Sequence, residues 1–331
     1  MWLAPLLILL IIALFGYFYG LSLLAPVSAD EQPPAIIEIP QNSTSGTVAA
    51  VLEEKGLIKN ALVFRLYSRY KGWDSKIQTG EYQLAASMST PEILKTLTSG
   101  NQVFYTFTIP EGYTVEQIAQ LLEDEGFGKK EKFLQLSREG DDYQYPFLNQ
   151  QSGTKYLLEG YLFPDTYKVT KQSTEQDIIY MMLERFMQEL EKIDFESKAK
   201  QMNLNVHQAV TIAAMIEKEA LSDKDRPLIS GVIQNRLEKG MPLQIDATVL
   251  YALGKHKEMV LNKDLEVDSP YNTYQVSSLP PGPIASPGSA SLKAAVEPED
   301  SDYLYYVAKP DGSHAFSRTL TEHIRKAVKY Q

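Results

Sequence analysis

The N-terminal segment Trp2–Ala25 constrains the chain more than any other feature, because it is almost unbroken apolar sequence without a charged residue. It exceeds the roughly 20 residues that a helix needs to cross a bilayer. We therefore predict a retained transmembrane anchor over residues 1–25. Val27-Ser28-Ala29 resembles a small-residue cleavage site, so a cleaved signal peptide is the alternative. Only a short N-terminal stub precedes the segment, and we expect the bulk of the chain on the far side of the membrane.

The composition excludes several classes of function. A formal net charge of −10 argues against nucleic acid as a partner, because phosphate binding needs a basic surface. The absence of Cys removes disulfides, thiolate nucleophiles and Cys-ligated metals. No HExxH pair, Walker loop or GxGxxG motif with a distant acid occurs, and no GxSxG elbow is present. We therefore expect neither a metal nor a cofactor.

Helical and strand patterns alternate along the rest of the chain, which predicts the α+β class. The 331 residues suffice for a membrane segment and two domains. Pro, Ser and Asn are frequent after the anchor, as in a linker. We place the boundaries as follows: anchor 1–25, linker 26–45, small αβ subdomain 46–102 and larger mixed α+β domain 103–331.

One short pattern occurs twice, about 70 residues apart. Ile39-Pro40, a Thr and a helical stretch closed by Gly56 recur as Ile109-Pro110, a Thr and a helical stretch closed by Gly126. Both copies fit an extended segment followed by a helix with a glycine at its C-terminal end. Two copies are too few for a solenoid, so we interpret the pattern as a duplicated small αβ unit.

The stretch Asn205–Ala220 predicts a helix, since it holds many good helix formers and neither Gly nor Pro. Its apolar residues form one broad stripe, and Glu217 and Glu219 fall at the margins of that stripe. A carboxyl at the edge of an apolar face can keep its proton near neutral pH, as a general acid must. The alternative is a surface helix end with ordinary solvated side chains.

Further polar residues lie in aromatic segments or in loops stiffened by Pro and Gly. Together they suggest a cleft for a sugar polymer, in which carboxyls transfer protons, amides and hydroxyls bind sugar hydroxyls and aromatic rings stack on sugar faces. Turn capping is the alternative for Asp246 and Asn272, and a satisfied turn histidine for His314. Core packing is the alternative for the aromatic residues Tyr161 and Phe163. The candidate substrate-binding residues are Glu159, Gln244, Asp246, Tyr271, Asn272 and His314.

Five motifs in order resemble the endolytic murein transglycosylases, the YceG-like or MltG family. Each motif is weak alone, but the resemblance covers nearly the whole chain. The motifs are Leu158–Tyr167 (LEGYLFPDTY), Ile216–Glu219 (IEKE), Asn235-Arg236-Leu237 with Gly240–Asp246, Tyr271–Tyr274 (YNTY) and Leu279–Ile284 (LPPGPI).

The resemblance implies a single-pass protein of the cell inner (plasma) membrane with an extracytoplasmic catalytic domain and a LysM-like subdomain at 46–102. It implies cleavage between N-acetylmuramic acid and N-acetylglucosamine within nascent peptidoglycan strands. The products would carry 1,6-anhydro-muramyl ends, and cleavage would terminate strand elongation. The implied partners are glycan strands and the peptidoglycan synthases of the divisome or elongasome.

A lytic reaction of this kind needs only one carboxyl group, which first acts as acid and then as base. Larger apolar neighbours precede Glu219 than Glu217 at the i−4 and i−3 positions, so burial should raise the pKa of Glu219 more. We therefore choose Glu219 as acid/base and give Glu217 a supporting catalytic role. Two alternatives stay open: a lysozyme-type hydrolase that uses Glu219 with Asp246, and a non-catalytic glycan-binding scaffold.

Overall fold

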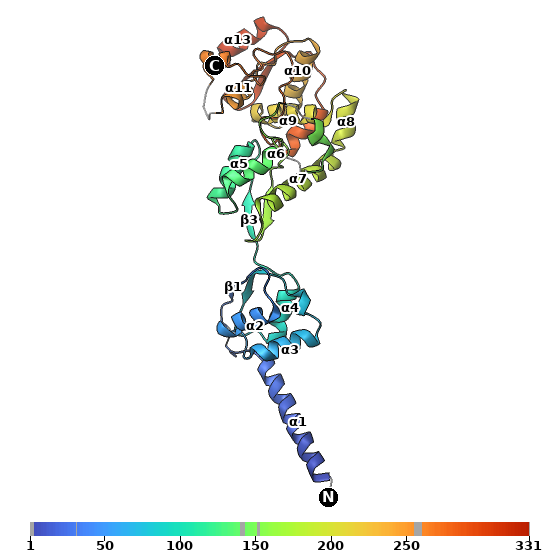
Figure 1. The fold of residues 1–331 in the computed structure, drawn as a ribbon. Helices are drawn as coiled ribbons and strands as arrows, with labels where there is room; N and C mark the ends of the chain where they lie inside the picture. The colour runs from blue at the N-terminus through green and yellow to red at the C-terminus, as the bar shows by residue number, and fades with distance from the viewer. Residues whose placement is uncertain (1–2, 31, 140–142, 151–152, 255–259, 331) are drawn as a thin grey trace. The chain divides into compact units, whose positions relative to one another are not determined.

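The computed structural model describes residues 3–30, 32–139, 143–150, 153–254 and 260–330. Helices and short two-stranded sheets are mixed along the chain, which confirms the α+β class (Figure 1). Two compact units emerge: residues 1–105 with 168–173, and residues 106–167 with 174–331.

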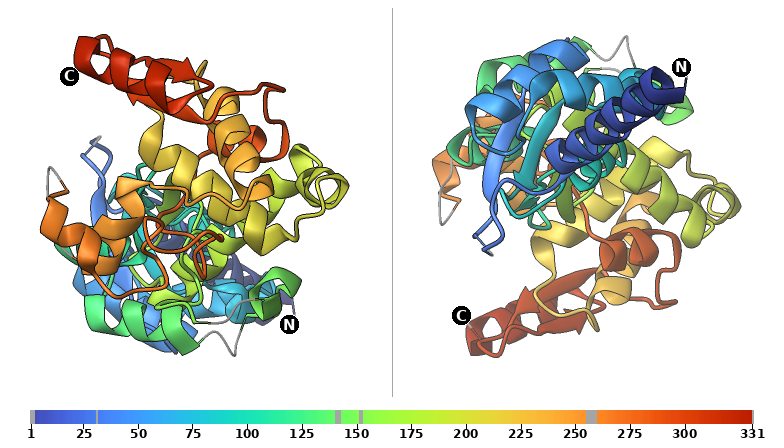
Figure 2. Two further views of the ribbon diagram at one scale, coloured as in Figure 1. Left: turned by 90° about the horizontal axis from the view of Figure 1, so that it is seen from above. Right: turned by 90° about the horizontal axis from the view of Figure 1, so that it is seen from below.

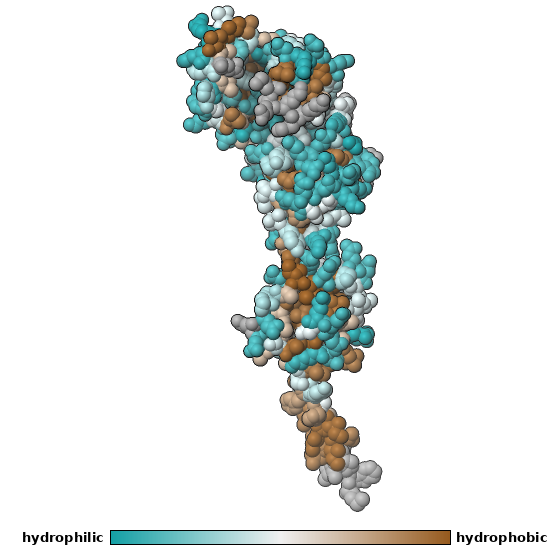
Figure 3. Space-filling model, turned by 90° about the vertical axis from the view of Figure 1, so that its left-hand side faces the viewer, coloured by the Kyte–Doolittle hydropathy of each residue, from teal (hydrophilic) through white to brown (hydrophobic). Residues whose placement is uncertain are grey.

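The N-terminal helix α1 (Leu3–Leu24) has the length and composition of a membrane span. Its residues 7–24 have a mean hydropathy of 2.4, and none of them is buried. Figure 3 shows this exposed apolar surface, to which Leu7, Leu9 and Phe15 contribute. A signal sequence near the N-terminus has the same properties, so the helix agrees with either reading of the segment.

The first unit continues with a small αβ arrangement. Strands β1 and β2 pair in antiparallel register from Ala35↔Leu84 to Ile39↔Gly80. Buried apolar side chains from both strands and three helices form its core, among them Ile39, Leu52 and Phe64. Its elements in chain order are β1 (Ala35–Ile39), α2 (Ser45–Glu54), α3 (Ala61–Tyr70), the 3-10 turn η1 (Asp74–Lys76), β2 (Gly80–Leu84) and α4 (Thr90–Thr98).

The linker predicted over 26–45 is wrong where it includes β1. Ile37 and Ile39 are buried, and they alternate with the exposed Ile36 and Glu38. The prolines and polar residues on either side dominated the composition of this stretch. A five-residue strand is too short to change such an average, although its alternation is visible in the sequence.

The second unit is mainly helical, and α9 lies in its interior. Helices α8, α10, α11 and α12 all contact α9 (Figures 1 and 2). The strands β5 and β6 form an antiparallel hairpin with Tyr306 opposite Phe316, and α13 packs on it. The helices are α5 (Val115–Asp124), α6 (Lys130–Glu139), α7 (Glu175–Lys192), α8 (Phe195–Gln201), α9 (Val206–Glu219), α10 (Arg226–Glu238), α11 (Asp246–Leu253), α12 (Ser289–Val296) and α13 (Leu320–Tyr330). The strands are β3 (Tyr105–Thr108), β4 (Thr166–Val169), β5 (Tyr305–Ala308) and β6 (His314–Ser317), and 3-10 turns lie at η2 (Pro146–Gln150) and η3 (Asn262–Glu266).

The predicted repeat corresponds to matching local structure in both copies. Thr44 caps α2 and Thr114 caps α5, each through a side-chain oxygen that accepts from the backbone N–H three residues later. Both helices close in the same way, with Leu57 N donating to Leu52 O and Phe127 N donating to Leu122 O. A second helix and a paired strand follow in each copy, as β1-α2-α3-β2 and β3-α5-α6-β4. The duplication therefore extends further than the sequence pattern indicated.

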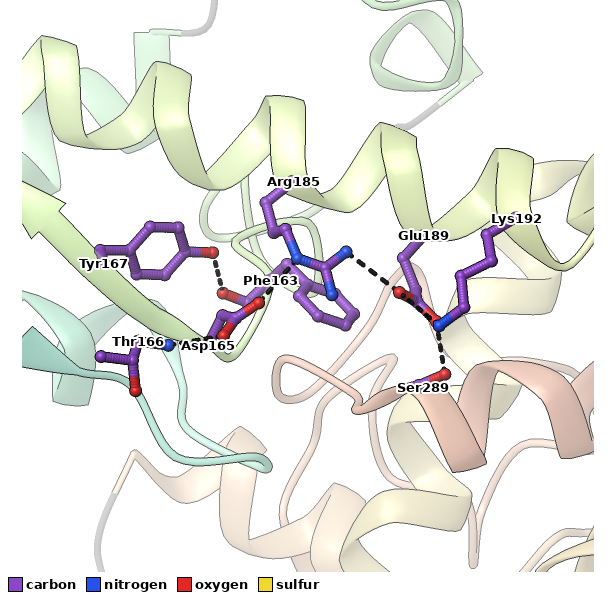
Figure 4. Close-up of polar contacts among 8 residues, drawn as sticks. All are labelled: Phe163, Asp165, Thr166, Tyr167, Arg185, Glu189, Lys192 and Ser289. Carbon is purple, nitrogen blue, oxygen red and sulfur yellow. Dashed lines mark hydrogen bonds and ion pairs between the residues drawn. The ribbon is translucent and has the colours of Figure 1, made fainter.

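The motif Leu158–Tyr167 is largely core and framework. Tyr161, Leu162 and Phe163 are buried, as the core-packing alternative expected. Asp165 accepts a hydrogen bond of 2.7 Å from Arg185 Nε, and Arg185 Nη1 donates to the buried Glu189 at 3.0 Å (Figure 4). Glu189 also accepts from Ser289 at the start of α12. The motif is thus joined to α7 through Arg185, and Glu189 joins α7 to α12.

The same motif fixes the proline-rich loop Leu279–Ile284. His207 Nε2 donates to Pro281 O at 2.6 Å, so Nδ1 of the neutral ring accepts from Tyr161 Oη at 2.6 Å. Burial lowers the pKa of His207, which favours this neutral form. Gly160 has a φ of 85°, and a Cβ there would lie 2.3 Å from Pro283 Cβ. Only glycine fits this close approach.

We predict that Gly160→Ala lowers the thermal unfolding midpoint strongly, since it adds a left-handed strain of about 1–2 kcal/mol and an overpacking cost of about 1–3 kcal/mol. Gly240→Ala is the matched control, because Gly240 has a φ of 64° and open space around the added Cβ. Near-ultraviolet circular dichroism on heating measures both variants. Equal losses in the two variants would contradict the packing of Gly160 on Pro283.

Candidate functional site

Helix α9 brings the candidate acid to the site. Asn205 and Gln208 form a reciprocal capping box at its start, and every residue from Ala209 to Ile216 is buried. The sequence predicted one apolar stripe with two polar margins. The helix is instead covered on all sides, because small residues such as Ala213 and Ala214 let neighbouring helices approach closely.

Glu219 is the last residue of α9 and follows its buried apolar run. Its Oε2 accepts a 3.0 Å hydrogen bond from Tyr306 Oη on β5. Burial raises the pKa of Glu219 to about 7, the Tyr306 hydrogen bond lowers it, and the charge of Asp246 raises it. The side chain keeps partial access to solvent. A carboxyl of this kind can both donate and accept a proton near neutral pH.

Glu217 has a different environment, although it is only two residues away. Its Oε2 accepts a 2.9 Å bond from Gly288 N, the N-cap residue of α12. Its Oε1 lies 3.5 Å from Arg226 Nη1, and the two side chains are 7% and 9% exposed. Both oxygens therefore hold α9 to α12 and α10. This geometry indicates a structural use of the group.

The loop before α11 is held in place by Arg236. Its Nη1 donates to the carbonyls of Pro242 and Leu243, and its Nε donates to Leu304 O. Gln244 Oε1 accepts from the same guanidinium at 3.2 Å, and the residue is exposed. Gln244 adopts a φ of 55°, which turns the chain sharply. Arg236 thus presents this loop to the solvent beside β5.

Asp246 is exposed at the first turn of α11 and faces the same region as Glu219. Tyr274 Oη donates to its Oδ1 at 2.5 Å. The sequence placed Asp246 on a loop stiffened by Pro and Gly, which is wrong, because α11 begins at this residue. The Pro and Gly nearby suggested an irregular segment, but Asp246 is a favourable residue for the positive end of a helix.

Tyr271 and Asn272 lie inside the wall of the site. The Asn272 amide donates to the carbonyls of Leu265 and Val267, and its Oδ1 accepts from Tyr274 N. Tyr271 is buried, with its ring 4.9 Å from that of Tyr251. Asn272 therefore shapes the segment that carries Tyr274, as the turn-capping alternative supposed. Direct contact of either residue with substrate stays a prediction.

Glu159 is also buried. Its Oε1 accepts from Val115 N at the start of α5, and its Oε2 accepts from Tyr251 Oη at 3.1 Å. Burial raises the pKa of Glu159 to about 8, and these two hydrogen bonds lower it. Substrate contact by this side chain stays a prediction.

His314 contacts Tyr306 and Asp225. Its backbone N–H and its Nδ1 both meet Asp225 Oδ2, at 2.7 and 3.0 Å. Its ring packs edge-on against Tyr306 at 5.5 Å. His314 therefore supports Tyr306, which in turn contacts Glu219, and its own contact with substrate stays a prediction.

The sequence did not single out Tyr306 or Arg226 as parts of the site. Tyr306 lies in a strand with several aromatic residues, and any of these could be core. Arg226 begins α10, and nothing in its local sequence indicates that it faces Glu217. Alternation along β5 was the one usable signal for Tyr306, since it places Tyr306 and Tyr305 on opposite faces. Within the described parts of the chain, no group of three or more His, Asp or Glu side chains could hold a metal ion.

Comparisons with known proteins identify the family of the chain. The profile of the YceG-like family matches residues 37–329. The endolytic murein transglycosylase of Bacillus subtilis (strain 168) is 40% identical over 95% of this chain and 90% of that protein. The endolytic murein transglycosylase of Streptococcus pneumoniae serotype 2 (strain D39) is 35% identical over 96% of this chain and 62% of that protein.

A solved structure extends the comparison to three dimensions. The crystal structure of a yceG-like protein from Listeria monocytogenes is 38% identical to this chain. The alignment has a TM-score of 0.60 and covers 89% of this chain and all of that one. The resemblance indicated by the five motifs is thereby confirmed, and the chain belongs to the YceG-like family.

Proposed function

We propose that this protein is a membrane-anchored endolytic peptidoglycan transglycosylase with Glu219 as its acid/base. One observation carries the proposal: Glu219 ends a buried helix and accepts a hydrogen bond from Tyr306. Burial there raises the pKa of this carboxyl to about 7. Relatives that bear the name endolytic murein transglycosylase, one of them aligned over 90% of its length, support it.

The reaction needs one group in two protonation states. Protonated Glu219 donates its proton to the glycosidic oxygen between N-acetylmuramic acid and N-acetylglucosamine as the C1–O bond breaks. The resulting carboxylate then takes the proton of the muramyl C6 hydroxyl, whose oxygen attacks C1 to form the 1,6-anhydro ring. No water is consumed, and Glu219 ends protonated as it began. Cleavage within a nascent strand would also end its elongation.

The roles that we propose for the remaining candidate residues follow from whether their side chains are exposed. Gln244 and Asp246 are exposed on the loop that Arg236 holds, so we propose them as contacts to sugar hydroxyl and acetamido groups. The charge of Asp246 also favours a positive oxocarbenium-like centre nearby. For Glu217 and Asn272 we propose positioning roles, because their polar atoms already bind the protein.

For the N-terminal part we propose that α1 is a single-pass anchor in the plasma membrane and that the rest of the chain lies outside the cytoplasm. The length and apolarity of α1 support the anchor, and the cell-wall substrate supports the orientation. The order β1-α2-α3-β2 in the first unit supports a LysM-like glycan-binding role. Enzymes that polymerise glycan strands are the proposed partners, since they supply the nascent substrate.

A lysozyme-type hydrolase is the second candidate, because the exposed carboxylate of Asp246 lies within electrostatic reach of Glu219. In that reaction Asp246 would activate water and the product would carry a reducing muramyl end. Mass spectrometry of digested strands separates the two, since an anhydro end lacks one water. Reducing ends alone would overturn the transglycosylase proposal, and a complete lack of cleavage would favour a glycan-binding scaffold.

We predict that Glu219→Gln lowers the rate of glycan cleavage by about 10²–10⁴-fold, because the amide cannot donate the proton. Liquid chromatography with mass spectrometry of the anhydro products measures this rate. Thermal unfolding should change little, since glutamine can still accept from Tyr306. An active Glu219→Gln enzyme would contradict the assignment.

Glu217→Gln is the matched variant, for which we expect a large loss of stability and a small loss of cleavage rate. It removes a charge that faces Arg226, so we expect a loss of about 1–3 kcal/mol in the free energy of unfolding. Cleavage at a temperature where the variant is folded should fall less than ten-fold. A rate loss as large as that of Glu219→Gln, with stability unchanged, would assign the acid to Glu217.

We predict that cleavage falls as the pH rises through about 7, because the first step needs protonated Glu219. In Tyr306→Phe the carboxylate loses a stabilising hydrogen bond, so the pKa of Glu219 rises and the fall moves to higher pH. The pH dependence of kcat/KM measures both effects. Tyr303→Phe is the control, because the Tyr303 ring packs on Phe316. If kcat/KM of Tyr306→Phe falls at the same pH as in the unmodified protein, or at a lower pH, this role of Tyr306 is excluded.

A further inference from the structure

A cavity of about 380 Å³ lies in the second unit. It is bounded by α5, the start of α6, the segment 155–159, α9 and α11. This volume is in the range of sites that hold small ligands. Ala247, Leu250 and Ile284 form an apolar part of its wall, and Thr114 and Gln117 add polar atoms. None of the roles proposed above for the reacting groups uses this cavity.

Three lysines line the cavity, in a protein whose net charge is −10. Lys130 Nζ donates to Gln120 Oε1 at 2.8 Å, Lys155 Nζ to Glu116 Oε1 at 2.7 Å and Lys218 Nζ to Gly112 O at 3.3 Å. An ammonium has three N–H groups. Each of these lysines can therefore donate further hydrogen bonds to a ligand.

The two carboxyls in the lining do not neutralise this charge. Burial raises the pKa of Glu116, but hydrogen bonds from Lys155 and Tyr156 outweigh it and the pKa is lowered, so Glu116 is ionised at neutral pH. Burial raises the pKa of Glu159 to about 8, which leaves that carboxyl mostly neutral at pH 7. Three ammonium groups thus face one carboxylate, and the cavity favours an anion.

The cavity shares two helices with the candidate active site. Lys218 of α9 lines it, and Glu219 is the next residue along the same helix. Ala247 of α11 lines it, and Asp246 directly precedes it. The lining of the cavity and the candidate active-site residues are therefore one residue apart on both helices.

The aromatic rings of the lining argue against a stacked sugar. The Tyr156 ring is engaged by Arg138 at 4.8 Å and by Lys155 at 5.4 Å, while Tyr251 packs against Tyr271. Sugar rings bind to open aromatic faces, whereas carboxylates bind to ammonium groups. In murein, the substituent next to the scissile bond that carries carboxylates is the peptide attached to the muramyl lactyl group.

We propose that this cavity binds carboxylates of the stem peptide on the muramyl residue, through Lys130 and Lys155. The inference rests on the proposed function, since it names the part of the murein substrate that the enzyme would recognise. It makes the enzyme selective for strands that still carry peptides, as newly polymerised strands do.

The test compares two substrates with the full-length protein in detergent: uncrosslinked strands with peptides, and the same strands after an amidase has removed the peptides. Lys130→Ala/Lys155→Ala should lower kcat/KM on peptide-bearing strands by about ten-fold, as expected for lost charged hydrogen bonds. On stripped strands it should stay within about two-fold of the unmodified protein. Lys129→Ala/Lys132→Ala is the control, because it removes the same charge from exposed neighbours outside the cavity.

Isothermal titration calorimetry on the Glu219→Gln protein measures ligand binding in the absence of cleavage. The disaccharide-tetrapeptide should bind about ten-fold more weakly when Lys130 and Lys155 are alanine, and the peptide-free disaccharide should bind equally to both proteins. Equal losses on both ligands, or no loss on either, would overturn the peptide site. If the unmodified protein cuts neither strand while the lysine-dependent binding persists, the proposed function fails and the peptide site stands.

Discussion

The complete burial of α9 is the constraint on which the rest of the second unit depends. Helices α8, α10, α11 and α12 pack around it, and the apolar run from Ala209 to Ile216 leaves no room for a charge until the last turn. Glu219 is therefore placed where apolar surface ends and solvent begins. A carboxylate there is disfavoured by burial and by the negative end of the helix. The same packing that stabilises the fold thus sets the protonation of the candidate acid.

Around this helix, charged side chains fix the positions of loops and helix ends through hydrogen bonds. Arg236 binds three backbone carbonyls, two of them in the loop before α11. Glu217 fixes the start of α12, and Glu189 joins that helix to α7. Each of these groups is buried and satisfied, which makes its geometry specific, since an unpaired partner would be costly. The exposed residues Gln244 and Asp246 owe their positions to this framework.

The order of strand, two helices and strand occurs twice in the chain, and the two copies pack against different neighbours. In the first unit the helices enclose a self-contained apolar core. In the second copy, α5 and α6 line a cavity that α9 and α11 complete, beside Glu219 and Asp246. A small module has thus become part of the wall of a larger domain. This difference arises from what packs against the module, because the capping of α2 and α5 is the same.

Local patterns in the sequence determined much of the protein. Length and apolarity defined α1, and good helix formers with an apolar stripe predicted α9 within a few residues. The ordered motifs indicated the family, and apolar neighbours favoured Glu219. Short elements such as β1 and α11 were missed, because few residues carry their signal. Only the tertiary structure distinguished Glu217, which pairs with Arg226, from Glu219, which meets Tyr306. These partners come from distant parts of the chain, and no local pattern encodes which distant group will face a side chain once the helices pack.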